Sequence, residues 1–451
     1  MTIQPLRKQV SNFVLAIALV TGTAMVAGHI VPDEAQAQRK KKKKKEKAAK
    51  AEYSEAFIAA YNPVDEAMKA EGADIATIRP QLDALIPVSV SPDERLAAGG
   101  LIYNAGVTSS DRTLQLQGME MMLSSGKVPI ENTGRYNFIA YQIANNMKDY
   151  AKARTFLQGA IDNNFTTETI GISDLQIAMA ESYFSDDENA AGLDYLERAI
   201  EARKSKGEAV DEAWYRRGIT VAYNNEIVPQ VYDMALAWVA DYPSSKNWRD
   251  AINLARNLNT YEGAEMLDLL RLSRKVDALQ DKLDYVIYVE SADARRLPKE
   301  VKDVIEQAYA ADAVSRDDIF VAESLETANS RIASDRADLP ALERDAMAAD
   351  AGLRTVVAAG SAFLSYGEYD KAVTFYKKAL AMPGVDANES LTRLGIAQIG
   401  MGDYAAAKES FAKITGNRLP IAKLWAGYAL QQTGGAAAEE SATSTGEVMG
   451  G

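Results

Sequence analysis

The sequence predicts an all-α protein built as a solenoid of helical hairpins, and three observations support this prediction. Glycine, alanine and aromatic positions recur every 34 or 35 residues in parts of the chain. Apolar residues elsewhere return at intervals of three and four, the period of one helix face. No long stretch alternates apolar with polar residues as a half-buried strand does, and residues 88–90 are the only short candidate. With 451 residues, 47% of them hydrophobic, the chain is long enough to bury a large core.

Residues 1–37 have the pattern of a secretory signal peptide. Arg7 and Lys8 form a basic start, residues 13–27 are apolar, and Ala-Gln-Ala at 35–37 supplies the small residues of a cleavage site. We therefore expect cleavage before Gln38 and a periplasmic location in a bacterial envelope. The alternative is a membrane anchor formed by an uncleaved N-terminal helix.

The composition excludes several kinds of active site. The chain has no cysteine and a single histidine, His29, which falls within the predicted signal peptide. The mature chain would then lack disulfides, thiolate metal sites, Ser-His-Asp triads and histidine-bound zinc. We expect no metal, no cofactor and no catalytic residue. The numerous carboxylates leave one alternative open, an envelope enzyme that uses a pair of them.

Residues 38–52 are predicted to form a disordered basic arm. Between 38 and 50 there are nine basic residues and one acidic residue, whereas residues 51–451 carry 39 basic and 60 acidic residues, a net charge of −21. Like charges repel and cannot form a core. The arm is either a solvated tail or an electrostatic tether to an anionic membrane surface, worth about 1 kcal/mol per basic residue. Its principal cations are Arg39, Lys40, Lys41, Lys42, Lys43, Lys44 and Lys45. Nucleic acid is not an expected partner, because the body is acidic.

Residues 53–130 are predicted to form an N-terminal helical region without a clear repeat. Helices are expected over 53–71, 74–85 and 92–105, where apolar residues follow helical spacing. Ser91 is a good N-cap, followed by Pro92 at the first helical position and by acids in the first turn.

Residues 131–316 are predicted to be helical repeats. Trp214 and Trp248 lie 34 residues apart, and Pro243 stands where a repeat should end. Tyr141 occupies a position where a small residue is expected, which argues against close packing there. Gly192 occupies the position at which the repeat pattern expects the alanine of the second helix. A run of ordinary helical hairpins of this length is the simpler interpretation.

Residues 350–433 carry the clearest repeat, joined to the preceding block by a charged helical segment at 317–349. The pairs Gly360 and Gly395, Gly367 and Gly402, and Ala372 and Ala407 are each 35 residues apart. A small residue in the first helix lets the second helix approach closely, and Gly-Asp-Tyr makes the turn. Pro340 should break the 317–349 segment, which is either a rigid connection or a hinge. Residues 421–432 form a closing helix, and residues 434–451 form a disordered tail.

This pattern resembles the tetratricopeptide (TPR) repeat, which has about 34 residues per helical hairpin. The resemblance implies a right-handed superhelix whose first helices line a concave groove for peptide or protein partners. Carried onto this chain, the groove positions include Arg135, Phe138, Gln142, Asn145, Tyr215, Lys246, Arg249, Asn253 and Arg256. In the C-terminal block they are Arg354, Val357, Ser361, Leu364, Glu389, Thr392, Ile396 and Ile399, a more apolar set that could pack on another helix, including the 317–349 connection.

The cations on one stripe of the groove suggest a ligand. Lys246, Arg249 and Arg256, with Asn253, fall on the face opposite Trp248 and would form a positive patch on an acidic body. The resemblance implies a site for an acidic or C-terminal peptide segment, and an ordinary solvated helix face is the alternative. The expected function is therefore a non-catalytic protein-protein interaction or assembly module of the cell envelope. The carboxylate enzyme and the membrane tether remain the alternatives.

Overall fold

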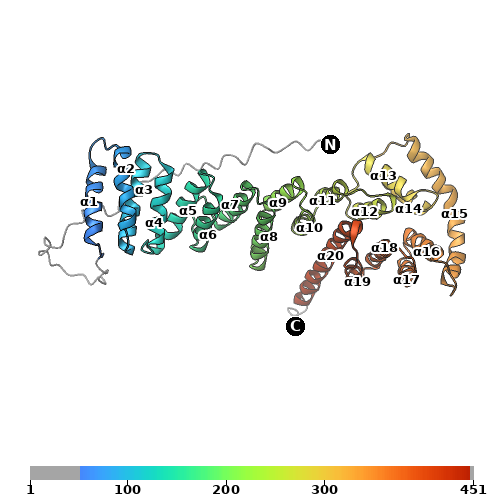
Figure 1. Cartoon of the computed structure of the whole chain (residues 1–451). Coiled ribbons are helices and arrows are strands. Elements are labelled where there is room, and N and C mark those ends of the chain that lie inside the picture. Colours follow the sequence, from blue (N-terminus) through green and yellow to red (C-terminus); the bar gives the residue numbers. More distant parts are fainter. Residues whose placement is uncertain (1–50, 447–451) are drawn as a thin grey trace. The chain divides into compact units, whose positions relative to one another are not determined.

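The computed structural model describes the backbone of residues 51–446 and the side chains of residues 51–433 (Figure 1). Over this part of the chain every regular element is helical, which confirms the predicted all-α helical-repeat fold. None of the described helices is both long enough and apolar enough to cross a membrane. The predicted signal peptide and the basic residues 39–50 lie outside the described residues.

The chain divides into two compact units at the boundary between Ile172 and Ser173. In unit 1 the described helices are α1 (Glu55–Lys69), α2 (Ile75–Val88), α3 (Pro92–Thr108), α4 (Arg112–Ser124), α5 (Ile130–Asn146) and α6 (Tyr150–Asp162). The division falls inside the block predicted at 131–316, so the α5–α6 hairpin belongs with the N-terminal helices.

Unit 2 begins with α7 and contains the remaining described helices. They are α7 (Ile172–Ser185), α8 (Asn189–Ser205), α9 (Glu212–Asn224), α10 (Gln230–Asp241), α11 (Ser245–Leu258), α12 (Gly263–Lys275), α13 (Lys282–Ala292), α14 (Pro298–Ala310), α15 (Ile319–Met347), α16 (Leu353–Tyr366), α17 (Tyr369–Leu380), α18 (Ala387–Gly400), α19 (Tyr404–Phe411), the short 3-10 turn η1 (Gly416–Arg418) and α20 (Leu419–Gly446).

Helix α3 of unit 1 begins where the sequence predicts a helix start, with Ser91 as its N-cap. The Ser91 hydroxyl accepts from the Glu94 N–H at 3.2 Å, and the Glu94 carboxylate accepts from the Ser91 N–H at 2.7 Å, which makes a capping box. The same carboxylate accepts from the Ser54 N–H at 2.7 Å and so fastens α1 to α3. Burial raises the pKa of Glu94, but these hydrogen bonds outweigh burial and lower it to about 2.

The α5–α6 hairpin packs closely despite Tyr141, because the small residue lies on the other helix. A Cβ atom added at Gly159 of α6 would stand 2.3 Å from Asn137 Oδ1 of α5. Tyr141 is half-buried. The expected loss of close packing therefore does not occur.

The predicted contacts of the C-terminal repeat are confirmed. A Cβ atom at Gly395 of α18 would lie 2.5 Å from the Phe411 ring of α19, and one at Gly360 of α16 would lie 3.0 Å from the Tyr376 ring of α17. Ala372 is completely buried. Each small residue thus makes room for an aromatic ring of the second helix in its own hairpin.

Pro340 does not break α15, contrary to the sequence prediction. The helix runs through it, and contacts on both sides hold it against the C-terminal repeat. Before the proline, Asp335 accepts from the Tyr366 hydroxyl at 2.8 Å, and after it Glu343 pairs with Lys371 at 2.9 Å. Tertiary contacts thus outweigh the backbone hydrogen bond that proline removes.

The predicted disordered tail also needs correction over its described part. Helix α20 passes Gly434 and continues to Gly446. The glycines at 434 and 435 disfavour a helix by about 1 kcal/mol each, but they precede three alanines and two glutamates, which are strong helix formers.

Within unit 2 the chain returns on itself, so that α20 lies against α10, α11 and α12 (Figure 1). The Trp425 indole N–H donates to the Asp268 carbonyl at 2.9 Å, and Lys423 pairs with Asp233 at 2.5 Å. One hydrophobic core consequently runs from Ala180 to Ala429 and joins the middle repeats to the C-terminal block.

Candidate binding site

The predicted cationic stripe on α11 is present, but its charges are paired within the chain. Arg249 contacts Asp281 at 2.5 Å and Asp284 at 3.0 Å, and Arg256 contacts Asp284 at 3.0 Å. Lys246 pairs with Asp250 one turn along the same helix, at 3.0 Å. Asn253 accepts from Arg256 at 3.3 Å.

The acids of this stripe come from α13 and from the residue that caps it. Asp284 is buried, with 7% of its side chain exposed, and it bridges the two arginines. Burial raises the pKa of Asp281, but hydrogen bonds from the Asp284 N–H and from Arg249 lower it overall. The stripe therefore fastens α11 to α13, and a peptide would have to displace a buried carboxylate to bind there. The expected positive patch is corrected to a neutralised internal contact.

Two other predicted groove residues lie in the interior. Phe138 of α5 is 6% exposed and stacks on Phe165 with ring centres 4.9 Å apart. Tyr215 of α9 is fully buried, and its hydroxyl donates to Asp241. Both aromatic rings serve as core residues, so the groove role predicted for them does not hold. Of the remaining positions on α5, Arg135 is exposed, whereas Gln142 and Asn145 are half-buried.

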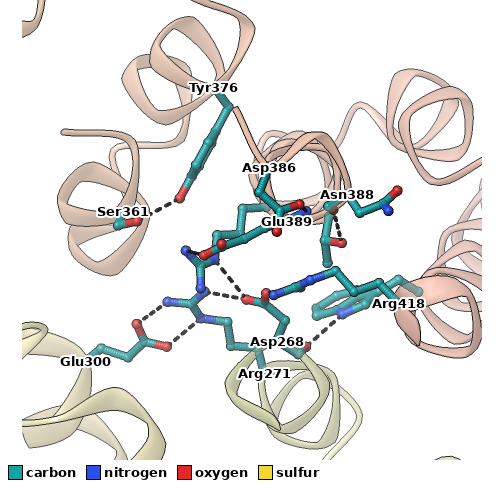
Figure 2. Close-up of polar contacts among 12 residues, drawn as sticks. Asp268, Arg271, Glu300, Ser361, Tyr376, Asp386, Asn388, Glu389 and Arg418 are labelled. Carbon is teal, nitrogen blue, oxygen red and sulfur yellow. Dashed lines mark hydrogen bonds and ion pairs between the residues drawn. The ribbon is translucent and has the colours of Figure 1, made fainter. Parts of the chain in front are cut away.

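A buried ionic cluster joins α12 to the C-terminal block (Figure 2). Asp268 of α12 is completely buried and accepts from three arginines. Arg418 lies at 2.7 Å, Arg271 at 2.9 Å and Arg393 at 3.3 Å. Residues separated by as much as 150 positions in sequence thus share one carboxylate.

The cluster extends to α14 through Arg271. Its guanidinium donates to both oxygens of Glu300, at 2.7 and 2.8 Å (Figure 2). The Tyr288 hydroxyl donates to the same carboxylate at 2.7 Å. Burial raises the pKa of Asp268 and of Glu300, but the neighbouring arginines outweigh it and lower both. These carboxylates stay ionised and paired, so neither is suited to act as a general acid at neutral pH.

The apolar half of the predicted C-terminal groove is filled by the chain itself. Thr392, Ile396 and Ile399 of α18 are buried, and α18 contacts α12 and α20. Helices α17 and α19 also contact α18, so this face is covered within the chain. The 317–349 segment, which forms α15, packs instead on α14 and α16 and makes an ion pair with α17.

The other half of the groove remains open as a pocket of about 690 Å³. Its walls come from the turn before α14, from α16 and from the first two turns of α18. Its lining includes four of the predicted groove positions, Arg354, Val357, Ser361 and Glu389. The pocket is within the size range of ligand sites in proteins. We call it the α16–α18 pocket.

Arg393 connects this pocket to the ionic cluster. Its side chain lines the pocket, is 4% exposed, and pairs with both Asp268 and Glu389. The sequence places Glu389 in the groove but gives no signal for Arg393, which falls next to a groove position. Its role depends on Asp268, 125 residues earlier, and a repeat register does not contain that information.

The described residues hold no group of three or more acidic, histidine or cysteine side chains arranged to bind a metal ion. One half-buried carboxylate stands apart from the paired ones. Burial raises the pKa of Glu197 on α8, and the nearby Asp233 adds to the effect. Neither residue lies in the α16–α18 pocket.

No protein-family model matches this chain, and no match was found among curated proteins.

Proposed function

We propose that this protein is a non-catalytic binding module of the bacterial cell envelope, a TPR-type array that holds a peptide or protein segment in the α16–α18 pocket. One observation carries the proposal. The pocket opens on the first helices of the clearest repeat, where four predicted groove positions meet around one cavity: Arg354, Val357, Ser361 and Glu389. The signal-like pattern of residues 1–37 supports export to the periplasm.

The chemistry of the pocket favours binding over catalysis. Its two acids are Asp386, which caps α18 by accepting from the Glu389 N–H at 2.9 Å, and Glu389, which pairs with Arg393. Both are engaged in holding the fold. The open part of the lining consists of arginines, hydroxyl groups and aliphatic side chains, which are suited to recognising a chain segment.

The proposal is tested by crosslinking from inside the pocket. A photoreactive amino acid replaces Ala358, an exposed lining residue, or Thr374, an exposed residue on α17 outside the pocket. In the native envelope, Ala358 should give discrete adducts that Thr374 does not give. The double variant Arg296→Glu with Arg354→Glu should lose them. Adducts of equal yield from both positions, or adducts that survive the charge reversal, would contradict the proposal.

A second candidate function, a tether to an anionic membrane surface, is favoured by the charge distribution. The arm at 39–50 is strongly basic, whereas the body that follows has a net charge of −21. Liposome flotation with anionic vesicles, comparing the mature chain with a form that lacks residues 38–50, tests this role. Flotation that depends on the arm and disappears at high salt would support it.

A further inference from the structure

We infer that the α16–α18 pocket recognises a carboxylate carried by the bound segment next to an apolar residue. This inference rests on the proposed function and adds the chemical class of ligand. It depends on two arginines, one hydroxyl group and an apolar wall that meet in a single cavity.

The two arginines come from different elements, and both lack an anionic partner among the described residues. Arg296 lies in the turn before α14, and Arg354 lies in the first turn of α16. Both side chains are exposed and line the pocket. Among the described residues neither guanidinium forms an ion pair or a side-chain hydrogen bond. Arg271, Arg393 and Arg418, in the cluster below, all have carboxylate partners.

The acids of the pocket do not cancel this charge. Glu389 is paired with Arg393, which also serves Asp268, and Asp386 is held at the start of α18. Arg296 and Arg354 therefore line a cavity whose own two carboxylates already have partners within the chain. A guanidinium group binds a carboxylate with two parallel hydrogen bonds. A carboxylate on the ligand would therefore supply the anionic partner that Arg296 and Arg354 do not have within the chain.

A hydroxyl group without a partner in the described chain adds a third polar group to the pocket. Ser390 of α18 is 3% exposed and lines the pocket. Within the described chain its hydroxyl has no hydrogen-bond partner, whereas the nearby Thr392 hydroxyl donates to the Asn388 carbonyl at 2.7 Å. The Ser390 oxygen is not among the fully buried side-chain atoms that lack a partner, so it stays accessible to a molecule in the pocket. A ligand oxygen in the pocket would accept the Ser390 proton.

The rest of the pocket wall is apolar, and it favours an apolar residue next to the carboxylate of the ligand. Leu297, Leu353 and Val357 line the pocket beside the two arginines. A carboxylate alone would leave this surface in contact with water, whereas an aliphatic side chain next to the carboxylate would cover it. The carboxylate can come from the end of a polypeptide or from an acidic side chain, and the two sources share this chemistry.

The experiment uses the full mature chain and fluorescence anisotropy with three pools of labelled hexapeptides. The peptides contain only apolar and small residues, and the pools end in a free carboxylate, in an amide, or in an amide with one internal glutamate. At least one carboxylate pool should bind ten-fold or more tightly than the plain amide pool. The pool that binds better identifies the source of the carboxylate.

The variants separate recognition from general charge. Arg296→Ala and Arg354→Ala should each weaken the preferred pool about ten-fold. Arg295→Ala, which removes the same charge from the neighbouring exposed position outside the pocket, should leave binding unchanged. Ser390→Ala should weaken binding several-fold with no change in charge. All four sites lack side-chain partners in the described chain, so thermal unfolding should match that of the wild-type protein.

The outcomes distinguish this inference from the proposed function. Equal binding of the amide and carboxylate pools would overturn the carboxylate inference and leave peptide binding intact. If no pool binds while the crosslinker at position 358 still gives specific adducts, the carboxylate inference is likewise overturned and the proposed function stands. If no pool binds and Ala358 gives no adducts, both fail. An equal loss in Arg295→Ala and Arg296→Ala would reduce the effect to net charge and also overturn the inference.

Discussion

The α11 arginines show what a single sequence can and cannot establish about a side chain. Helical spacing correctly places Trp248 on the buried face, and Arg249 and Arg256 on another. It cannot show that Asp284, on a later helix, reaches the same two guanidinium groups. Pairing depends on the rotation between successive hairpins, which no local pattern encodes. Arg296 and Arg354 are the same residue type, but no carboxylate of the described chain pairs with them.

The ionic cluster leads to a stability prediction at the residue scale. Asp268→Ala leaves Arg271, Arg393 and Arg418 without their shared carboxylate in a buried site. Breaking a buried pair in this way costs about 3–5 kcal/mol, because uncompensated charge remains. Urea unfolding should show this loss. Asp250→Ala, which removes an exposed pair with Lys246, should change the free energy of unfolding by less than about 1 kcal/mol.

The same carboxylates predict an acid dependence. The pKa values of Asp268 and Glu300 are lower in the folded than in the unfolded chain. Their contribution is therefore fully present above the unfolded values of about 4, and is lost as pH falls through the lower folded values. The urea midpoint of the wild-type protein should drop between pH 5 and pH 3. Asp268→Ala should show a smaller drop, and an equal drop would contradict the assignment.

At the scale of elements, the sequence identifies hairpins best where a small residue and an aromatic ring meet. It finds the α16–α17 and α18–α19 hairpins, because glycine and aromatic positions repeat in register. It does not predict α4, which contacts α3 through glycines: a Cβ atom at Gly118 would lie 2.5 Å from the Tyr103 backbone N. That contact uses a glycine on each helix, outside the 35-residue register, so periodicity does not reveal it.

Gly395 tests the packing of one hairpin. Gly395→Leu should destabilise unit 2 by about 1–3 kcal/mol, because the side chain would collide with Phe411. The higher helix propensity of leucine returns at most about 1 kcal/mol. Gly263→Ala is the matched control, since no atom lies within 4 Å of a Cβ atom at that position. A Gly395→Leu protein as stable as the wild type would contradict this packing.

At the scale of the whole described chain, the principal result is the return of α20 to α10–α12 within unit 2. The sequence predicts a closing helix with Trp425, and the structure places that ring against the backbone of Asp268, 157 residues earlier. Sequence patterns detect the amphipathic helix but not its distant partner, because tertiary curvature accumulates over many hairpins.

This closure predicts an effect at a distance. Removal of residues 419–451 should expose Trp248 and raise hydrogen exchange across α10–α12, although these helices precede the cut by more than 140 residues. Removal of residues 434–451 alone should leave that exchange unchanged. Equal exchange in both truncated forms would show that α20 does not stabilise the middle of unit 2.

The central claim is that the α16–α18 pocket is where this protein holds its partner. Filling the cavity tests it most directly. Ala358 is exposed and lines the pocket, so Ala358→Trp should occupy the cavity without disturbing the core. Thr374→Trp on α17 adds the same ring outside the pocket. We predict that Ala358→Trp loses at least ten-fold in affinity for the preferred peptide pool at an unchanged melting temperature, whereas Thr374→Trp binds as the wild type does. Undiminished binding by the Ala358→Trp protein would contradict the claim.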